Sequence, residues 1–316
     1  MTLPSSGTIS LNQIHVEAGG SSGSTASIND SDIRVLIGKS SEASMSFNEW
    51  YGASREITLP SLTAINGYDN NSDITASGIS GLVAGGILII PEDFYLWSSS
   101  AGGAALIIDL ANITVQNSGF IVGKGGTGQS NAGGPAISIT ASGVTIINNS
   151  GAYIAGGGGS GTQGRNGGPA SGAGGGGQTG TPTLGAAGAA GANDGGSTGG
   201  RGGGAGGGSA SVTFQGAAGG GQGGYILPGS GGAGGSGGST AGVSGGSGSA
   251  AGATGNRGGD DGGGSLDSCG GGGGWGAAGG TRGTGFGAGG AGGKGIEANG
   301  NSFTLTNNGT IYGAQS

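Results

Sequence analysis

Charged residues, cysteine and histidine are all scarce in this chain, and each scarcity excludes a class of protein. Only 8% of the 316 residues are charged, the net charge is −7, and the arginines are scattered singly, so no basic surface for nucleic acid is expected. Cys269 is the only cysteine, which excludes an intrachain disulfide framework. The only histidine, His15, leaves no histidine-based metal site, and no base is suggested beside a nucleophile. We therefore expect no enzyme, no metal site and no cofactor.

Long apolar runs are also missing. The most apolar stretch, residues 82–90, is too short to cross a bilayer and is interrupted by glycine. The first residues contain neither a basic region nor an apolar run, so a standard secretion signal is not expected. The sequence thus predicts no membrane insertion.

Glycine is abundant instead, with 92 residues that are concentrated between about residues 155 and 293. A flexible linker is one interpretation of this segment, because glycine-rich chains are commonly random coils. Collagen is excluded, since the chain has only 7 prolines and its glycine phase slips repeatedly. Some other way of ordering the segment is needed if it is not a linker.

The local spacing of the glycines supplies a third interpretation. Glycine recurs at every third position in several runs, for example at Gly231, Gly234 and Gly237. Three residues per turn is the repeat of a polyproline-II helix, which has no internal hydrogen bonds and points every N–H and C=O outward. Because only glycine lets such backbones approach closely, the pattern predicts a bundle of polyglycine-II helices held together by backbone hydrogen bonds.

Three similar units make up the first part of the chain, at residues 9–14, 26–33 and 45–52. Each unit predicts a strand fragment, a polar helix cap and one helical turn. Ile14, Ile33 and Trp50 recur as the expected buried anchors of the units, and Phe47 and Tyr51 lie beside the third anchor. We interpret residues 1–56 as a small docking module that uses these five residues.

A longer repeat brackets the glycine-rich segment. Residues 113–123 are echoed at 144–156 and again at 303–313, and each copy contains asparagine and glycine between apolar residues. A short apolar alternation precedes each copy, at residues 105–108, 136–139 and 295–298. Alternating side chains place one apolar row inward, and asparagine and glycine suit the corners. The pattern predicts stacked β-rungs, which the last residues return to complete.

These observations together predict a mainly β and irregular fold with a small N-terminal module, β-solenoid rungs and a sandwich of packed polyglycine-II helices. The expected organisation is a module over residues 1–56, a β-rich linker with rungs over 57–154, the sandwich over 155–293 and a returning rung over 294–316. Strands are expected near residues 87–91 and 94–97, separated by an acidic turn.

The larger residues that interrupt the glycine runs are the candidates for binding, because rigid scaffolds commonly carry function in their loops. The aromatic ones are expected either to anchor an interface or to pack on the flank of the sandwich or on the β-stack. The loop candidates are Thr181, Leu184, Val212, Phe214, Tyr225, Ile226, Leu227, Arg257, Asp260, Asp261, Leu266, Trp275 and Phe286.

Two of these features resemble a known family. The stretch from Asn148 to Gly159 and its return from Asn307 to Gly313 are similar to the glycine-rich adhesins at tail or tail-fibre tips of tailed bacteriophages. The unit from Met45 to Gly52 also resembles a module near the start of many phage tail proteins. The resemblance implies a polyglycine-II sandwich in the virion whose end loops recognise an outer-membrane protein or surface glycan. It also implies that the N-terminal part attaches to the tail or fibre, with the protein made in the host cytoplasm.

Two other functions remain open at this point. The chain would be a structural tail protein if it made no receptor contact. It would be an ice-binding protein if it presented a flat face of threonine and alanine. A homotrimer and a single copy on a trimeric fibre are both compatible with the sequence.

Overall fold

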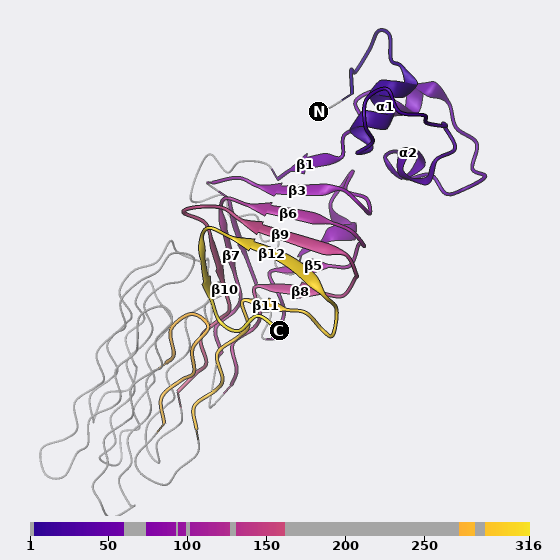
Figure 1. Cartoon of the computed structure of the whole chain (residues 1–316). Coiled ribbons are helices and arrows are strands. Elements are labelled where there is room, and N and C mark those ends of the chain that lie inside the picture. The colour runs from indigo at the N-terminus through magenta and orange to yellow at the C-terminus, as the bar shows by residue number, and fades with distance from the viewer. Residues whose placement is uncertain are drawn as a thin grey trace, which may run out of the picture.

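A computed structural model describes residues 3–59, 74–92, 94–98, 102–126, 131–161, 272–281 and 288–316. These residues form a small helical N-terminal unit followed by a stack of short strands (Figure 1). The stack is mainly β, as the sequence predicted. The N-terminal unit lies at the β1 end of the stack.

The strands form three sheets, which we call A, B and C, and every neighbouring pair of strands is parallel. Each turn of the chain visits sheet B, then A, then C, so the sheets wind into a β-solenoid whose turns we call coils. Sheet A contains β1 (Glu56–Thr58), β3 (Ile87–Ile90), β6 (Thr114–Asn117), β9 (Val144–Asn148) and β12 (Phe303–Asn307). Sheet B contains β2 (Ile74–Thr75), β5 (Leu106–Ile108), β8 (Ile137–Ile139) and β11 (Ile296–Glu297). Sheet C contains β4 (Tyr95–Trp97), β7 (Phe120–Val122), β10 (Tyr153–Ala155) and β13 (Thr310–Tyr312).

Alternation of apolar and polar side chains explains why these residues form strands. In sheet A, Leu88, Val115 and Ile146 are in register on successive strands and are fully buried. Their neighbours along each strand point outward, as the period of two requires. The inward residues of all three sheets form one hydrophobic core, so each coil is buried mainly against the next. The predicted rungs, and the return of the last residues to the stack, are confirmed.

An asparagine ladder runs along one corner of the solenoid. Asn117, Asn148 and Asn307 occupy the same position in β6, β9 and β12. The Asn117 side-chain amide donates to Asn148 Oδ1 at 2.9 Å, and the Asn148 amide donates to Asn307 Oδ1 at 2.8 Å. Asn117 and Asn148 are fully buried, so these bonds satisfy polar groups that water cannot reach. The repeated asparagine therefore fixes the register of the coils.

The N-terminal unit contains α1 (Leu11–Glu17), α2 (Ser31–Val35) and the 3-10 helix η1 (Phe47–Trp50). Ser10 and Gln13 form a capping box at the start of α1. The three expected helical turns are confirmed, but the strand fragments before them are wrong. The reason is local, because the amides of Ser10 and Ser27 donate to the side chains of Gln13 and Asp30 rather than to a neighbouring strand.

The unit is joined to the solenoid by buried polar contacts. Glu17 Oε1 accepts from the Arg55 amide at 2.9 Å and from the Ser54 hydroxyl at 3.3 Å. The Arg55 guanidinium donates to the Gly85 carbonyl at 2.6 Å, which ties the junction to the turn before β3. The unit therefore ends at residue 55, and Glu56 begins sheet A.

Another polar contact fixes η2 (Ala76–Gly78) against the corner after β5. Asp109 accepts hydrogen bonds from the Ser77 amide and hydroxyl. Burial raises the pKa of the Asp109 carboxyl, but these hydrogen bonds outweigh it and hold the pKa below its ordinary value.

No helix within the described ranges is long and apolar enough to span a membrane.

Candidate functional site: the root of the glycine-rich segment

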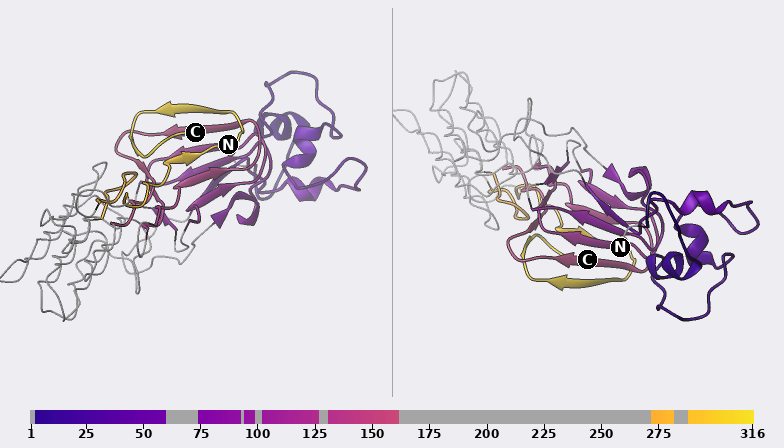
Figure 2. Two further views of the ribbon diagram at one scale, coloured as in Figure 1. Left: turned by 90° about the horizontal axis from the view of Figure 1, so that it is seen from below. Right: turned by 90° about the horizontal axis from the view of Figure 1, so that it is seen from above.

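The glycine-rich segment is inserted into a single corner of the solenoid. The chain leaves the stack after β10 and returns at β11, and β11 pairs with β8. We call the described stretches at this corner the glycine-rich root, which comprises residues 123–126, 131–136, 156–161, 272–281 and 288–295. These stretches run side by side away from the ends of sheets B and C (Figures 1 and 2).

Residues 155–160 occupy the centre of the root, since four other stretches bond to them. The amides of Gly157 and Ser160 donate to the carbonyls of Gly134 and Asn131, at 2.9 and 3.0 Å. The donors are three residues apart, and so are the acceptors. A strand would instead alternate its bonds with a period of two.

The carbonyls of the central stretch repeat the same spacing. They accept from three pairs of glycine amides, each pair three residues apart, at distances between 2.7 and 2.8 Å. The pairs are Gly273 and Gly276, Gly290 and Gly293, and Gly123 and Gly126. The root therefore repeats its backbone hydrogen bonds every three residues and to several sides, and three residues is also the repeat length of a polyproline-II helix.

Close backbone contact explains why these positions are glycine. A Cβ atom on Gly157 would overlap the carbonyl oxygen of Lys124, and one on Gly159 would overlap that of Gly290. In both cases the obstacle is backbone, which cannot rotate away as a side chain can. Ser160, the first larger residue of this stretch, is fully buried, and its hydroxyl accepts from the Asn131 amide at 2.8 Å.

One large side chain fixes the root to the solenoid. Trp275 is 0% exposed and packs with Val122 and Ala155 on the outward face of sheet C. Its ring meets those of Tyr153 and Tyr312 edge-on, with centroid distances of 6.3 and 6.0 Å. Trp275 was predicted as a receptor contact or as a residue packed on the β-stack. The structure places it on the stack, so the receptor-contact prediction is wrong for this residue.

The remaining loop candidates lie outside the described residues. These are Thr181, Leu184, Val212, Phe214, Tyr225, Ile226, Leu227, Arg257, Asp260, Asp261, Leu266 and Phe286. Within the described ranges, no group of three or more histidine, cysteine, aspartate or glutamate side chains is arranged to hold a metal ion.

The five residues predicted for attachment occupy two different environments. Ile14, Ile33 and Trp50 are fully buried in the core of the N-terminal unit, which confirms them as anchors but keeps them from touching a partner directly. Trp50 Nε1 also donates to the Ile33 carbonyl at 3.2 Å. Phe47 is 42% exposed and tilts against Trp50, with ring centroids 5.9 Å apart. Tyr51 is half-buried and donates its hydroxyl to the Gly7 carbonyl.

Sequence reasoning missed a ladder of aromatic rings on sheet C. Tyr95 stacks on Phe120 with centroids 4.8 Å apart, and Phe120 stacks on Tyr153 at 5.2 Å. Tyr153 also stacks on Tyr312, at 6.3 Å. The first three rings begin the third strand of successive coils. Corners of unequal length precede these strands, and Ile90 occupies the asparagine position in the first coil, so aligning the repeats on their asparagines does not reveal the ladder.

Neither a family of proteins, nor a curated protein, nor a solved structure was found to match this chain. The case for a function therefore depends on the geometry of the described residues and on the chemistry of the sequence.

Proposed function

We propose that this chain is a bacteriophage tail adhesin in which a polyglycine-II sandwich over residues 155–293 displays receptor-binding loops. The receptor is a bacterial outer-surface protein or glycan. The chain acts as a binding protein and carries out no chemical step. Its place is the tail or the tip of a tail fibre.

The observation that carries the proposal is the step of three in the backbone hydrogen bonds of the root. A flexible linker would have no reason to make five stretches, some more than a hundred residues apart in the sequence, bond at this spacing. Bonds on several sides make each threefold helix a rigid rod, and rods anchored at one corner can hold their far turns in fixed positions. Fixed loops lose little entropy on binding, which favours recognition.

The N-terminal unit supports the second half of the proposal, attachment to the virion. It has its own hydrophobic core, separate from that of the solenoid. Phe47 is the one large hydrophobic residue with an exposed side chain among the described residues. An exposed aromatic ring supported by a buried one is a suitable anchor for a tail protein.

Adsorption to bacterial cells tests the receptor-binding role. Labelled protein should bind intact Gram-negative host cells, and replacing Tyr225, Ile226 and Leu227 by serine should reduce this binding. Ser142 and Thr304 are exposed on the solenoid, so glycine at Ser142 and serine at Thr304 provide controls that should bind normally. Unchanged adsorption after substitution of all the loop candidates would refute receptor binding through the loops and favour a structural tail protein.

One observation favours an ice-binding protein as a second candidate. Thr114, Thr145 and Thr304 are in register on the outward face of sheet A, with strands about 4.8 Å apart. The neighbouring outward column is less regular, since it contains Gln116, Ile147 and Thr306. A gap between the freezing and melting points of a solution of the protein would support this alternative over the adhesin.

A further inference from the structure

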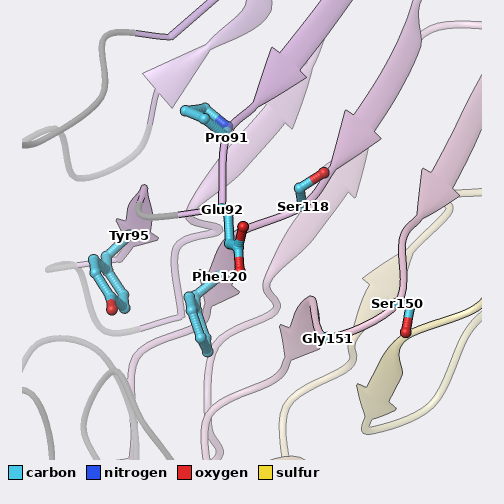
Figure 3. Close-up of a pocket in the computed structure, with 7 residues that line it drawn as sticks. All are labelled: Pro91, Glu92, Tyr95, Ser118, Phe120, Ser150 and Gly151. Atoms are coloured by element: carbon cyan, nitrogen blue, oxygen red, sulfur yellow. The ribbon is translucent and has the colours of Figure 1, made fainter.

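A groove of about 670 Å³ crosses the edge between sheets A and C, away from the glycine-rich root. Its lining comes from three successive coils (Figure 3). Pro91 and Glu92 form one wall, Tyr95, Ser118 and Phe120 form the floor, and Ser150 and Gly151 form the other wall.

Unequal corner lengths produce this groove. The corner between sheets A and C covers residues 91–94 in the first of these coils and 149–152 in the third, but only residues 118–119 in the coil between them. The longer corners project on both sides of the shorter one. Parallel pairing of β3, β6 and β9 holds the three coils in register, and the Asn117–Asn148 bond adds to it between the second and third, so the depression is a fixed part of the solenoid.

The polar groups of the groove are available to a ligand. The exposed side chains of Glu92 and Ser150 make no hydrogen bond or ion pair with the described part of the chain. The Ser118 hydroxyl accepts from Asn149 Nδ2 at 2.9 Å, which leaves its own proton free to donate. The groove thus offers a carboxylate acceptor and two hydroxyl groups.

The aromatic part of the floor is rigid. Phe120 stacks between Tyr95 and Tyr153, so its two faces are covered and its ring edge remains for the groove. The ring is half-buried and cannot turn without breaking both stacks. A ligand with a hydrophobic patch could rest on this edge while its polar groups reach the two walls.

We propose that this groove binds a neutral oligosaccharide. Sugar hydroxyl groups both donate and accept, which matches a carboxylate and two serine hydroxyls, while the C–H groups of a sugar can make van der Waals contact with the edge of Phe120. The Glu92 carboxylate accepts from sugar hydroxyls and, together with the net charge of −7, disfavours acidic sugars. The volume lies in the range of small-molecule sites, about 300 to 1,000 Å³. The site stands on the solenoid alone and does not require the loops of the glycine-rich segment to contact a receptor.

Calorimetric titration of the full chain tests the site. The probes are neutral oligosaccharides of glucose, galactose, mannose and N-acetylglucosamine, with oligogalacturonate as the acidic counterpart. At least one neutral probe should bind the chain. Oligogalacturonate should bind the chain at least about tenfold more weakly than that probe does. The substitution Glu92→Gln keeps the shape of the side chain but removes its charge. It should lower the affinity for the neutral probe about tenfold.

A matched pair of tryptophan variants separates the groove from the rest of the solenoid. Ser150→Trp should fill the groove and abolish binding, whereas Ser302→Trp, at an exposed position before β12, should bind as the unmodified chain does. Absence of binding by every neutral probe would overturn the proposal, and so would equal binding by both tryptophan variants or by the acidic probe. Cell adsorption that depends on the loops would be unaffected by any of these outcomes.

Discussion

Replacing Trp275 by alanine should loosen the glycine-rich root while leaving the solenoid intact. The side chain is fully buried between sheet C and the root, and it is the large residue that the two share. Loss of a buried tryptophan costs about 3–5 kcal/mol, and this includes the two edge-on contacts with Tyr153 and Tyr312. Because Trp275 Nε1 has no hydrogen-bond partner among the described residues, the substitution strands no polar group in that part of the chain.

Amide exchange measured by mass spectrometry provides the assay. A local loss of about 3 kcal/mol should speed exchange in residues 155–161 and 288–295 roughly 100-fold. Exchange in β6 and β9, which lie in the middle of sheet A, should change little. The variant Trp275→Phe keeps a ring against sheet C. Its exchange rate in the root should lie between those of the unmodified chain and Trp275→Ala.

A control substitution removes an equal side chain elsewhere. Trp50→Ala also deletes a fully buried indole, but from the separate core of the N-terminal unit, so exchange in the root should be unchanged. If Trp275→Ala left exchange in the root at its original rate, or accelerated it no more than Trp50→Ala does, the inferred joint between root and solenoid would be refuted.

Three further substitutions test other contacts. Gly157→Ala places a Cβ against a backbone carbonyl and should destabilise the root by about 1–3 kcal/mol, which would appear as faster amide exchange there. As a control, Ala291→Ser, at an exposed position of the same root, should have little effect on exchange. Asn148→Ala breaks the ladder on both sides and should lower the free energy of unfolding in urea by about 2 kcal/mol; an unchanged midpoint would contradict the ladder's role. Ser77→Ala should raise the pKa of Asp109 in an NMR titration. A depressed carboxyl pKa stabilises the fold at pH values above the ordinary pKa, and this stabilisation is lost as pH falls through the lowered pKa. The difference in unfolding free energy between the unmodified chain and this variant should therefore shrink over the same pH range.

The solenoid could be predicted from the sequence because its repeats carry a strong local pattern. Apolar alternation followed by asparagine identifies β6, β9 and β12, and the shared asparagine also gives their register. The sequence could even predict that the last strands return to the stack, although Phe303 and Val144 are far apart along the chain. Here the same residues specify both the strand and its partner.

The missed features depend on contacts that no local pattern encodes. Packing of Trp275 on the β-stack was one of two interpretations of the sequence, but the residue stands among glycines, and nothing beside it identifies Tyr153 and Tyr312 as its partners. The groove arises from a difference in length between neighbouring corners, which becomes visible only once the coils are aligned. In the N-terminal unit, side chains capture the amides that an expected strand would have used, as Asp30 does with Ser27.

The two ends of the glycine-rich segment are pinned to adjacent coils of the solenoid, by β10 on one side and β11 on the other. The strands that pair with these two ends, β7 and β8, lie in the solenoid itself, so the hydrogen bonds of the coils do not depend on how many residues lie between the ends. Whole turns can therefore be gained or lost in this segment over evolutionary time while the coils that hold it keep the same sequence.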